Sequence, residues 1–309
     1  MYRHDFIPGS PRVLFISDFF LMNHIIAGQD AHGNDIKLDY IDHGQGKPVV
    51  LIHGWPASYK MWEYQLTALT DQGFRVIAYT RRGFGNSSKP FEGHDYDTYA
   101  DDLKAVLDKL DLQDVTLVGF SMGGGEVARY MGRHGGARVS RVAFVSAVTP
   151  FLLKTADNPE GVDRATFDGM IEGLEKDRFS FLQDFGKNFY GVGLLSNPVS
   201  DATLNWTQAM CEVADPHATI VSARAWSETD FRQDLTTIKV PTLVIHGGDD
   251  ALVPPKVSGE RMTKFVPHAE FIEYAGAPHG LFIPEKERLN RDLITFVHGG
   301  DIQKTADRY

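Results

Sequence analysis

The stretch VTLVGFSMGGGEVARYMG, from Val115 to Gly132, decides the fold of this chain. It begins with strand-forming residues and ends as an amphipathic helix, and Ser121 stands at the junction between Gly119 and Gly123. A sharp strand-to-helix turn forces its central residue into a sparsely populated backbone conformation. Side chains two positions away on either side would clash there, so both positions need glycine. The pattern predicts that Ser121 is a nucleophile held on a strained turn.

Two further residue types must follow this serine if it is a nucleophile. A serine hydroxyl is weakly nucleophilic at neutral pH, and it needs a base that an acid orients. In this architecture the acid comes next along the chain and the histidine last. Asp249 and Asp250 stand just beyond a predicted strand, and His279 stands just beyond the next one. His279 is therefore the predicted base, while spacing alone does not separate Asp249 from Asp250 as the acid.

Negative charge that develops on a carbonyl oxygen needs at least two N–H donors. The backbone of Met122, directly after Ser121, is one predicted donor. The loop LIHGWPAS, which follows an earlier strand, supplies the other at Trp55, before a turn at Pro56. His53 in this loop precedes the nucleophile in the chain, so we interpret it as a residue that orients the loop. We interpret His246 in the same way.

Strand and helix patterns alternate along the chain from residue 36. Apolar runs such as KPVVLIHG are typical of strands buried on both faces of a parallel sheet. The predicted strands cover 36–42, 47–54, 74–80, 115–119, 141–147, 240–246 and 269–274, and the predicted helices between them cover 59–72, 98–110, 123–134 and 285–298. This alternation predicts an α/β fold with a mostly parallel sheet and helices on both faces. In such sheets the site lies at the carboxyl ends of the strands.

The strand pattern is interrupted once. About ninety residues between Ala147 and Val240 read as short helices around 163–175, 177–187, 201–213 and 216–226. We expect this insertion to cover the site as a helical cap. The predicted division is an N-terminal extension at 1–34, a core at 35–150 and 237–299, a cap at 151–236 and a C-terminal tail at 300–309.

Composition excludes several classes of function. The 309 residues are 42% hydrophobic, which is enough for a large core. The formal net charge is −10 and no basic run is longer than Arg81-Arg82, so we expect no nucleic-acid or membrane partner. Cys211 is the single cysteine, so it forms no intramolecular disulfide and no cysteine metal cluster. We interpret it as a buried apolar residue.

The N-terminal stretch RVLFISDFFLMNHIIAGQ looks at first like an export signal, because Arg3 and Arg12 precede an apolar run. Asp18 interrupts that run, and the run is too short to span a bilayer. We therefore expect a cytoplasmic protein with an N-terminal extension.

Taken together, the motifs of the chain resemble one family. The chain resembles the α/β-hydrolases, and among them the bacterial cofactor-free, non-haem chloroperoxidases, also described as perhydrolases and aryl esterases. The resemblance covers roughly residues 35 to 298 and rests on HGWP, YTRRGFGNSSKP, HDYDTYADDL, GFSMGGGEVARYMGRHG, SAVTPF, AWSETDF, VPTLVIHGGDD followed by ALVP, and GAPHG. It implies Ser121 as nucleophile, His279 as base and Asp250 as acid, because the family's acid lies four residues before the proline of its VP pair. Trp55 and Met122 match the family's oxyanion donors.

The resemblance also implies an activity. The family hydrolyses small esters through an acyl-enzyme and lets hydrogen peroxide replace water in the second step, which yields a peracid that oxidises halide away from the enzyme. No haem, metal or other cofactor is implied. Pro56 matches the proline of members with good perhydrolysis. Thr80, where the family usually has Asp, and Phe84, where it often has His, depart from the pattern and concern local packing.

We expect a small apolar acyl pocket beneath the cap, built from Trp55, Phe120, Phe151 and Leu252 together with Pro56. Several functions remain open at this point. A lactonase, an amidase or a carbon–carbon hydrolase uses similar serine chemistry, and a non-catalytic ligand-binding protein can keep the same residues. The substrate is expected to be a small ester with water or peroxide. The oligomeric state stays open, a homo-oligomer included.

Overall fold

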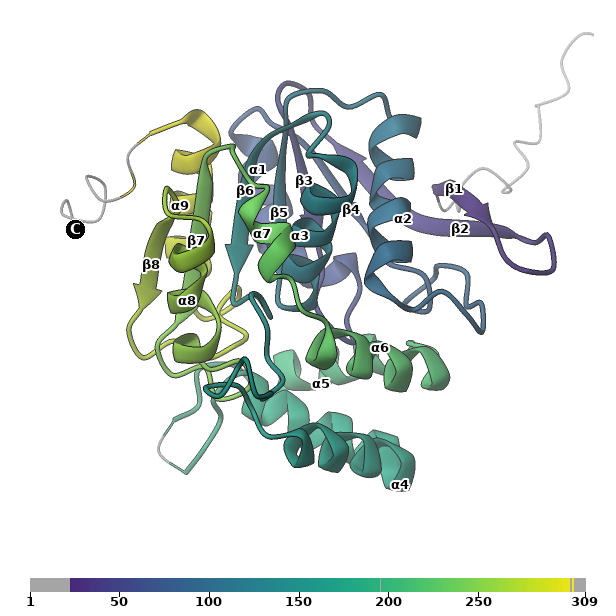
Figure 1. The fold of residues 1–309 in the computed structure, drawn as a ribbon, viewed down its shortest axis with the longest axis vertical. Helices are drawn as coiled ribbons and strands as arrows, with labels where there is room; N and C mark the ends of the chain where they lie inside the picture. The colour runs from purple at the N-terminus through teal and green to yellow at the C-terminus, as the bar shows by residue number, and fades with distance from the viewer. Residues whose placement is uncertain (1–22, 195, 301, 303–309) are drawn as a thin grey trace, which may run out of the picture.

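The computed structural model describes residues 23–194, 196–300 and 302 of the chain. Within them, one sheet of eight strands runs through the molecule in the order β1-β2-β4-β3-β5-β6-β7-β8 (Figure 1). β2 pairs antiparallel with both β1 and β4, and all other neighbours are parallel, so the predicted mostly parallel sheet is confirmed. The strands are β1 His24–Gln29, β2 Asp35–His43, β3 Pro48–Ile52, β4 Arg75–Tyr79, β5 Val115–Phe120, β6 Val139–Val145, β7 Thr242–Gly247 and β8 Glu270–Tyr274.

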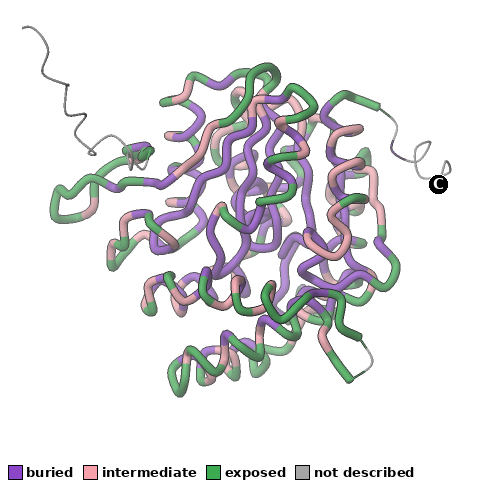
Figure 2. Tube along the Cα trace, turned by 180° about the vertical axis from the view of Figure 1, so that it is seen from behind, coloured by how far each residue is buried: buried purple, intermediate pink, exposed green. Residues whose placement is uncertain are grey.

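The central strands are buried on both faces, as their apolar runs predict. β5 is buried along its whole length, and Leu117 packs in one core cluster while Val118 packs in the other. Successive side chains of a strand point to opposite faces, so each face of the sheet carries its own core. Figure 2 shows the buried positions gathered in the central strands and the exposed positions along the outer helices.

Helices cover both faces. The cluster that contains Leu117 also holds side chains from α2, α3 and α8, and the cluster on the Val118 side holds side chains from α1 and α9. Their bounds are α1 Glu63–Asp71, α2 Tyr96–Lys109, α3 Met122–His134, α8 Gly259–Phe265 and α9 Lys286–His298. The predicted helix over 59–72 divides into a 3₁₀ turn, η2 Tyr59–Trp62, followed by α1; a second short 3₁₀ turn, η3 Pro255–Val257, precedes α8.

One strand lies where the sequence analysis expected only an extension. β1 occupies residues 24–29 and pairs with β2 at the edge of the sheet, with Ile25 buried between strand and helix layers. Its short run, HIIAGQ, continues the apolar stretch that looks like an export signal, so the sequence pattern does not mark it as a strand. The rest of the stretch considered as an export signal, within residues 1–22, lies outside the described residues. At the other end, Ile302 of the predicted tail is buried against the α1–α9 side of the core.

Four helices lie in the described part of the insertion between β6 and β7, and three of them, α4, α5 and α6, gather beyond one end of the sheet (Figure 1). They are α4 Arg164–Phe189, α5 Asp201–Glu212, α6 Pro216–Glu228 and α7 Arg232–Thr236. The side chains of Ser200 and Asp215 accept hydrogen bonds from backbone N–H groups in the first turns of α5 and α6, which is why these helices begin there. The fourth helix, α7, packs against α3 rather than with the other three.

The longest of these helices, α4, bends at Asp177. Its backbone there is non-helical, with φ −159° and ψ 90°, and its carboxylate accepts a hydrogen bond from Ser180 N at 3.0 Å. Asp177 therefore caps a new helical segment, which explains why the sequence indicated two helices that meet near this residue. No helix in the described ranges is long and apolar enough to cross a membrane.

Candidate active site

Ser121 lies at the joint between β5 and α3 with φ 53° and ψ −118°, a conformation that side chains rarely adopt. A Cβ on Gly119 would come within 2.5 Å of Gly123 O, and a Cβ on Gly123 would come within 2.5 Å of Ile52 O. Both glycines are therefore required by close backbone approach. The strained turn expected from the sequence is present, and it presents the serine at the N-terminus of α3.

Three side chains form a continuous hydrogen-bonded chain at this point. His279 Nε2 lies 3.0 Å from Ser121 Oγ, and His279 Nδ1 lies 2.6 Å from Asp250 Oδ2. Asp250 follows β7 and His279 follows β8, so the ends of three parallel strands bring the chain together. All three are buried, with exposed fractions of 7% for the serine and 3% for each of the others. The neighbouring Asp249 is exposed, so the structure separates the two aspartates that spacing left open.

The Asp250 carboxylate is fully engaged. Its Oδ1 accepts hydrogen bonds from Leu252 N at 3.0 Å and Val253 N at 2.8 Å. Burial by itself would raise the pKa of this carboxyl, but the imidazoles of His279 and His246 outweigh burial and hold the pKa below its usual range. Asp250 is therefore a carboxylate at neutral pH.

His246 has a contact that sequence reasoning missed. Its Nε2 lies 2.8 Å from Val253 O and 3.2 Å from Asp250 Oδ2. Because a carbonyl oxygen only accepts, Nε2 carries the proton and donates it to this pair of oxygens. His246 lies in β7, four residues before Asp250, and that spacing was the signal available in the sequence. His246 therefore holds the loop that carries Asp250, which is a more specific role than the loop-orienting one expected.

The loop after β3 lies directly against the serine. A Cβ on Gly54 would come within 3.2 Å of Ser121 Cβ, and the peptide bond between Trp55 and Pro56 is cis. Met122 is the first residue of α3, so its N–H has no acceptor within the helix itself. Trp55 follows Gly54 in this loop and Met122 follows Ser121, and their role as oxyanion donors stays a prediction.

A buried polar network ties this loop to α3. Arg81 donates from Nε to Glu126 Oε2 at 2.8 Å and from Nη2 to His53 O at 3.1 Å, and its backbone N–H donates to His53 Nε2 at 2.9 Å. All three residues have no measurable exposure. Burial lowers the pKa of His53 well below its usual value, so it is neutral and accepts. His53 thus orients the loop, as expected.

The comparisons with known proteins agree with this geometry. Residues 47–286 match the model of the alpha/beta hydrolase fold family. The chain belongs to the α/β-hydrolase fold family.

The chain is 42% identical over 267 residues to a non-heme chloroperoxidase of Kitasatospora aureofaciens, and this match covers 85% of this chain and 96% of that protein. A bifunctional esterase/perhydrolase of Acinetobacter calcoaceticus is 39% identical over the same shares. A bromoperoxidase structure from Bacillus anthracis superposes with a TM-score of 0.86 at 44% identity, over 89% of this chain and 99% of that one. Within the family, the chain falls in the non-heme chloroperoxidase group.

The hydrolase has a small cavity at the serine, with a volume of about 30 Å³. Core residues and cap residues both line it: Trp55, Ser121, Leu252, Val253 and His279 from the core, and Met170, Phe185 and Trp226 from the cap. The Trp55 ring packs edge-on against Phe185 at a centroid distance of 5.2 Å and lies 6.0 Å from the Trp226 ring. Aromatic side chains of α4 and α6 therefore contact Trp55 of the core beside the cavity.

Of the predicted pocket residues, Leu252 and Trp55 line the cavity and three do not. Phe120 is fully buried behind the site, where its ring packs 5.0 Å from the His279 ring. Phe151 is buried under the Arg232 guanidinium, 5.3 Å from the ring centroid. Pro56 is buried in its loop. The side chains that replace them come from α4 and α6, whose packing over the serine no local pattern shows.

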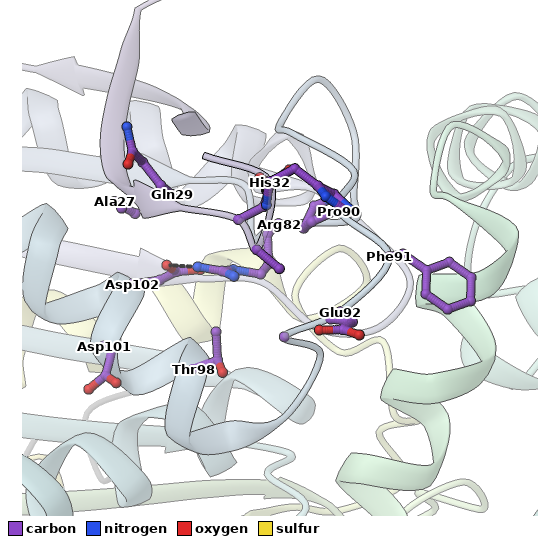
Figure 3. Close-up of a pocket in the computed structure, with 14 residues that line it drawn as sticks. Ala27, Gln29, His32, Arg82, Pro90, Phe91, Glu92, Thr98, Asp101 and Asp102 are labelled. Atoms are coloured by element: carbon purple, nitrogen blue, oxygen red, sulfur yellow. Dashed lines mark hydrogen bonds and ion pairs between the residues drawn. The ribbon is translucent and has the colours of Figure 1, made fainter. Parts of the chain in front are cut away.

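A larger hollow of about 610 Å³ lies elsewhere, between the β1–β2 hairpin and the start of α2 (Figure 3). Arg82 and Asp102 lie at its floor and pair with each other through two hydrogen bonds of 2.7 and 2.6 Å. Its lining includes neither Ser121 nor His279, so the small cavity is the candidate site of this α/β-hydrolase. Among the described residues, no group of three or more His, Cys, Asp or Glu is arranged to hold a metal ion.

Proposed function

We propose that this protein is a serine hydrolase that cleaves small carboxylic esters, with short acyl or aryl groups, through an acyl-enzyme. The observation that carries the proposal is the hydrogen-bonded chain from Ser121 through His279 to Asp250, with the serine on a strained turn at a helix N-terminus. The likeness to a chloroperoxidase and to an esterase/perhydrolase supports it.

In the proposed mechanism, His279 is the base. Since the Asp250 carboxylate only accepts hydrogen bonds, it fixes the proton of His279 on Nδ1 and leaves Nε2 free to take the proton of Ser121. The serine oxygen attacks the ester carbonyl, and the protonated imidazole then gives its proton to the leaving alcohol. We assign the oxyanion to the N–H groups of Trp55 and Met122, next to the positive end of α3.

The second half of the reaction releases the acyl group. His279 removes a proton from water, the water oxygen attacks the acyl carbonyl, and the Ser121 oxygen leaves with that proton. When hydrogen peroxide takes the place of water, the same step yields a peracid, which oxidises halide after it leaves the enzyme. This route assigns no step to a metal or a cofactor.

Two further proposals accompany this one. We propose that residues 151–236 act as a cap on a core formed by 35–150 and 237–299, because cap side chains line the cavity over Ser121. The packing of α7 against α3 makes the last part of that range a link back to the core. We also propose that the protein works in the cytoplasm.

The steady-state hydrolysis of p-nitrophenyl acetate tests the proposal, measured with and without a serine-directed phosphonate and repeated with hydrogen peroxide. We expect turnover that the phosphonate abolishes, a preference for short acyl chains, and peracid when peroxide is present. Ser121→Ala should lower kcat by about 10⁶-fold, because the nucleophile is lost.

A single burst without turnover would contradict the proposal and would favour a ligand-binding protein that keeps the triad. Unchanged hydrolysis by Ser121→Ala would contradict the assignment of the nucleophile.

A further inference from the structure

One oxygen of Asp250 lies against two imidazoles. Oδ2 is 2.6 Å from Nδ1 of His279 and 3.2 Å from Nε2 of His246, while Oδ1 accepts hydrogen bonds from two backbone N–H groups. The side chains of His246 and Asp250 have no measurable exposure, and that of His279 is 3% exposed. The proposed mechanism uses only the contact with His279. His246 is therefore a buried polar group beside the acid that has no part in the mechanism so far.

The ring of His246 carries a single proton. Its Nε2 shares that proton between Val253 O, at 2.8 Å, and Asp250 Oδ2. Its Nδ1 is buried and has no hydrogen-bond partner in the described part of the chain. The backbone of Gly259 packs against this nitrogen, since a Cβ on Gly259 would lie 2.6 Å from it. A second proton on Nδ1 would be a buried N–H without an acceptor, so His246 presents a neutral N–H dipole to the carboxylate.

A donor on the acid changes the behaviour of the base. The negative charge of a carboxylate next to an imidazole stabilises the protonated ring. The positive end of the His246 N–H lies at the same carboxylate oxygen and offsets part of that charge. All three side chains are buried, so water screens this effect little. His279 then binds its proton less tightly than it would beside a carboxylate without this donor.

We propose that His246 is a positioning residue that acts through Asp250: its N–H at Oδ2 weakens the hold of the carboxylate on protonated His279, so that His279 is a free base at a lower pH. This inference rests on the proposed function, because it takes His279 as the base. It goes beyond holding the loop of Asp250 in place, since a purely mechanical support would leave the proton affinity of His279 unchanged.

The ionisable groups on the surrounding elements are exposed, bound elsewhere or distant. In the loop after β7, in η3, in α8 and in β8, the exposed ones are Asp249, Lys256, Glu260, Lys264 and Glu273. The ones bound elsewhere are Arg261 with Glu160, Asp184 with Lys187 on α4, and Glu126 of α3 with Arg81. Glu270 lies at the opposite end of β8, in register with Leu243. The rings that pack on His279, Phe120 and Phe189, carry no charge.

Two matched variants separate the N–H of His246 from its packing. His246→Gln keeps a side-chain N–H that can reach the position of the imidazole Nε2, whereas His246→Met has nearly the same length and no donor. Both variants remove the ring from beside Gly259. A change that both share therefore measures packing, and a change confined to His246→Met measures the N–H.

The dependence of kcat/KM on pH reports the base of the free enzyme. Without the donor, more negative charge remains on Oδ2, protonated His279 is stabilised, and the free base is lost at a higher pH. With p-nitrophenyl acetate, we expect the midpoint of the acid limb to rise by about 0.5 to 1 pH unit in His246→Met. In His246→Gln it should stay within about 0.2 unit of the wild type.

Proton NMR of the resting enzyme gives a second readout, which needs no turnover. The Nδ1 proton of His279, assigned by its absence in His279→Gln, lies in the short hydrogen bond to Asp250. When Oδ2 loses its other donor it becomes a stronger acceptor, so this resonance should move downfield in His246→Met and stay in place in His246→Gln. In the wild type, nitrogen-15 spectra should show His246 with one proton, on Nε2, throughout the pH range in which His279 titrates.

Three results overturn the inference. The first is an acid limb in His246→Met at the wild-type pH, and the second is a limb that moves equally in both variants. The third is a wild-type His246 that gains a second proton within the range of His279, and this result decides the matter even if neither variant folds. A wild type that turns over no ester overturns the proposed function instead, and the spectra of the resting enzyme then still test whether His246 acts on the contact between Asp250 and His279.

Discussion

The core side and the cap side of the active site are built in different ways. On the core side, Ser121 and its flanking glycines are held by backbone atoms that approach to the limit of contact, and each catalytic candidate follows the end of a parallel strand. On the cap side, Met170, Phe185 and Trp226 reach the cavity as side chains of helices, which contact the core through aromatic packing and a few hydrogen bonds, such as that from Trp55 Nε1 to Thr219 O. Backbone contacts tolerate little change, whereas packed side chains tolerate exchange. The difference indicates that the core fixes the geometry of the catalytic candidates, while the helices of the insertion add side chains to the cavity wall.

The largest effect is expected at the core, with Asp250→Asn. The amide keeps the shape of the side chain, but it no longer fixes the proton of His279 on Nδ1. We expect kcat to fall by about 10⁴-fold with little change in KM. Asp249→Asn is the matched control, because Asp249 is the exposed neighbour of the same type.

The control should retain wild-type kcat. Equal losses in both variants would show that the loop as a whole matters and that the structure has not separated the two aspartates. Steady-state kinetics with p-nitrophenyl acetate measures both, and the thermal midpoint of each variant shows whether the fold is intact.

The strained turn at Ser121 could be predicted from sequence because its cause is local. A positive φ at Ser121 and close contacts at Gly119 and Gly123 depend on a few consecutive residues, and they leave a pattern in the chain. The place of His279 was also predictable, since the strand order of a parallel sheet brings strand ends together.

The cap side was not predictable in this way. The sequence analysis places Phe120 and Phe151 in the acyl pocket beneath the insertion, yet Phe120 packs behind His279 and Phe151 packs under Arg232. The true lining depends on how α4 and α6 lie over the sheet. That arrangement is set by contacts between residues more than a hundred positions apart, such as Trp55 with Phe185.

A smaller effect, on both stability and activity, is expected from Gly123→Ala. The added methyl group would lie 2.5 Å from Ile52 O and 2.9 Å from His53 O, so α3 and the loop after β3 must separate. Overpacking of this kind costs about 1–3 kcal/mol of unfolding free energy. Because the shift separates the two proposed oxyanion donors, kcat should also fall, by about 10²-fold.

Gly169→Ala is the matched control on the cap helix α4. No heavy atom lies within 4 Å of a Cβ added there, and its φ is not in the left-handed region. Alanine should stabilise this helical position by about 0.5–1 kcal/mol and leave kcat unchanged. Chemical denaturation and steady-state kinetics measure both quantities. If Gly123→Ala were as well tolerated as Gly169→Ala, the core side would not be the rigid part.

The smallest effect concerns local opening of the cap, and Cys211 reports it. This residue lies on α5, which packs on α4, and it is 5% exposed. Burial raises the pKa of its thiol to about 12, so at pH 8 only roughly one molecule in 10⁴ carries the reactive thiolate while the cap is closed. A thiol reagent should therefore label the native protein far more slowly than a free cysteine, and labelling should report opening events.

If the packing and the few hydrogen bonds that hold the cap, such as that from Gly280 N to Phe189 O, are weaker than the contacts within the core, the cap should open before the core unfolds. We expect labelling of Cys211 at denaturant concentrations where the amide protons of β5 remain protected from exchange. The difference in free energy between opening of the cap and unfolding of the core separates the two transitions. Coincident transitions would mean that α5 and β5 unfold as one unit. The contrast between a rigid core and an adaptable cap would then have no basis in stability. In that case the aromatic contacts of Trp55 with α4 and α6 would hold the cap as firmly as backbone contacts hold the turn at Ser121.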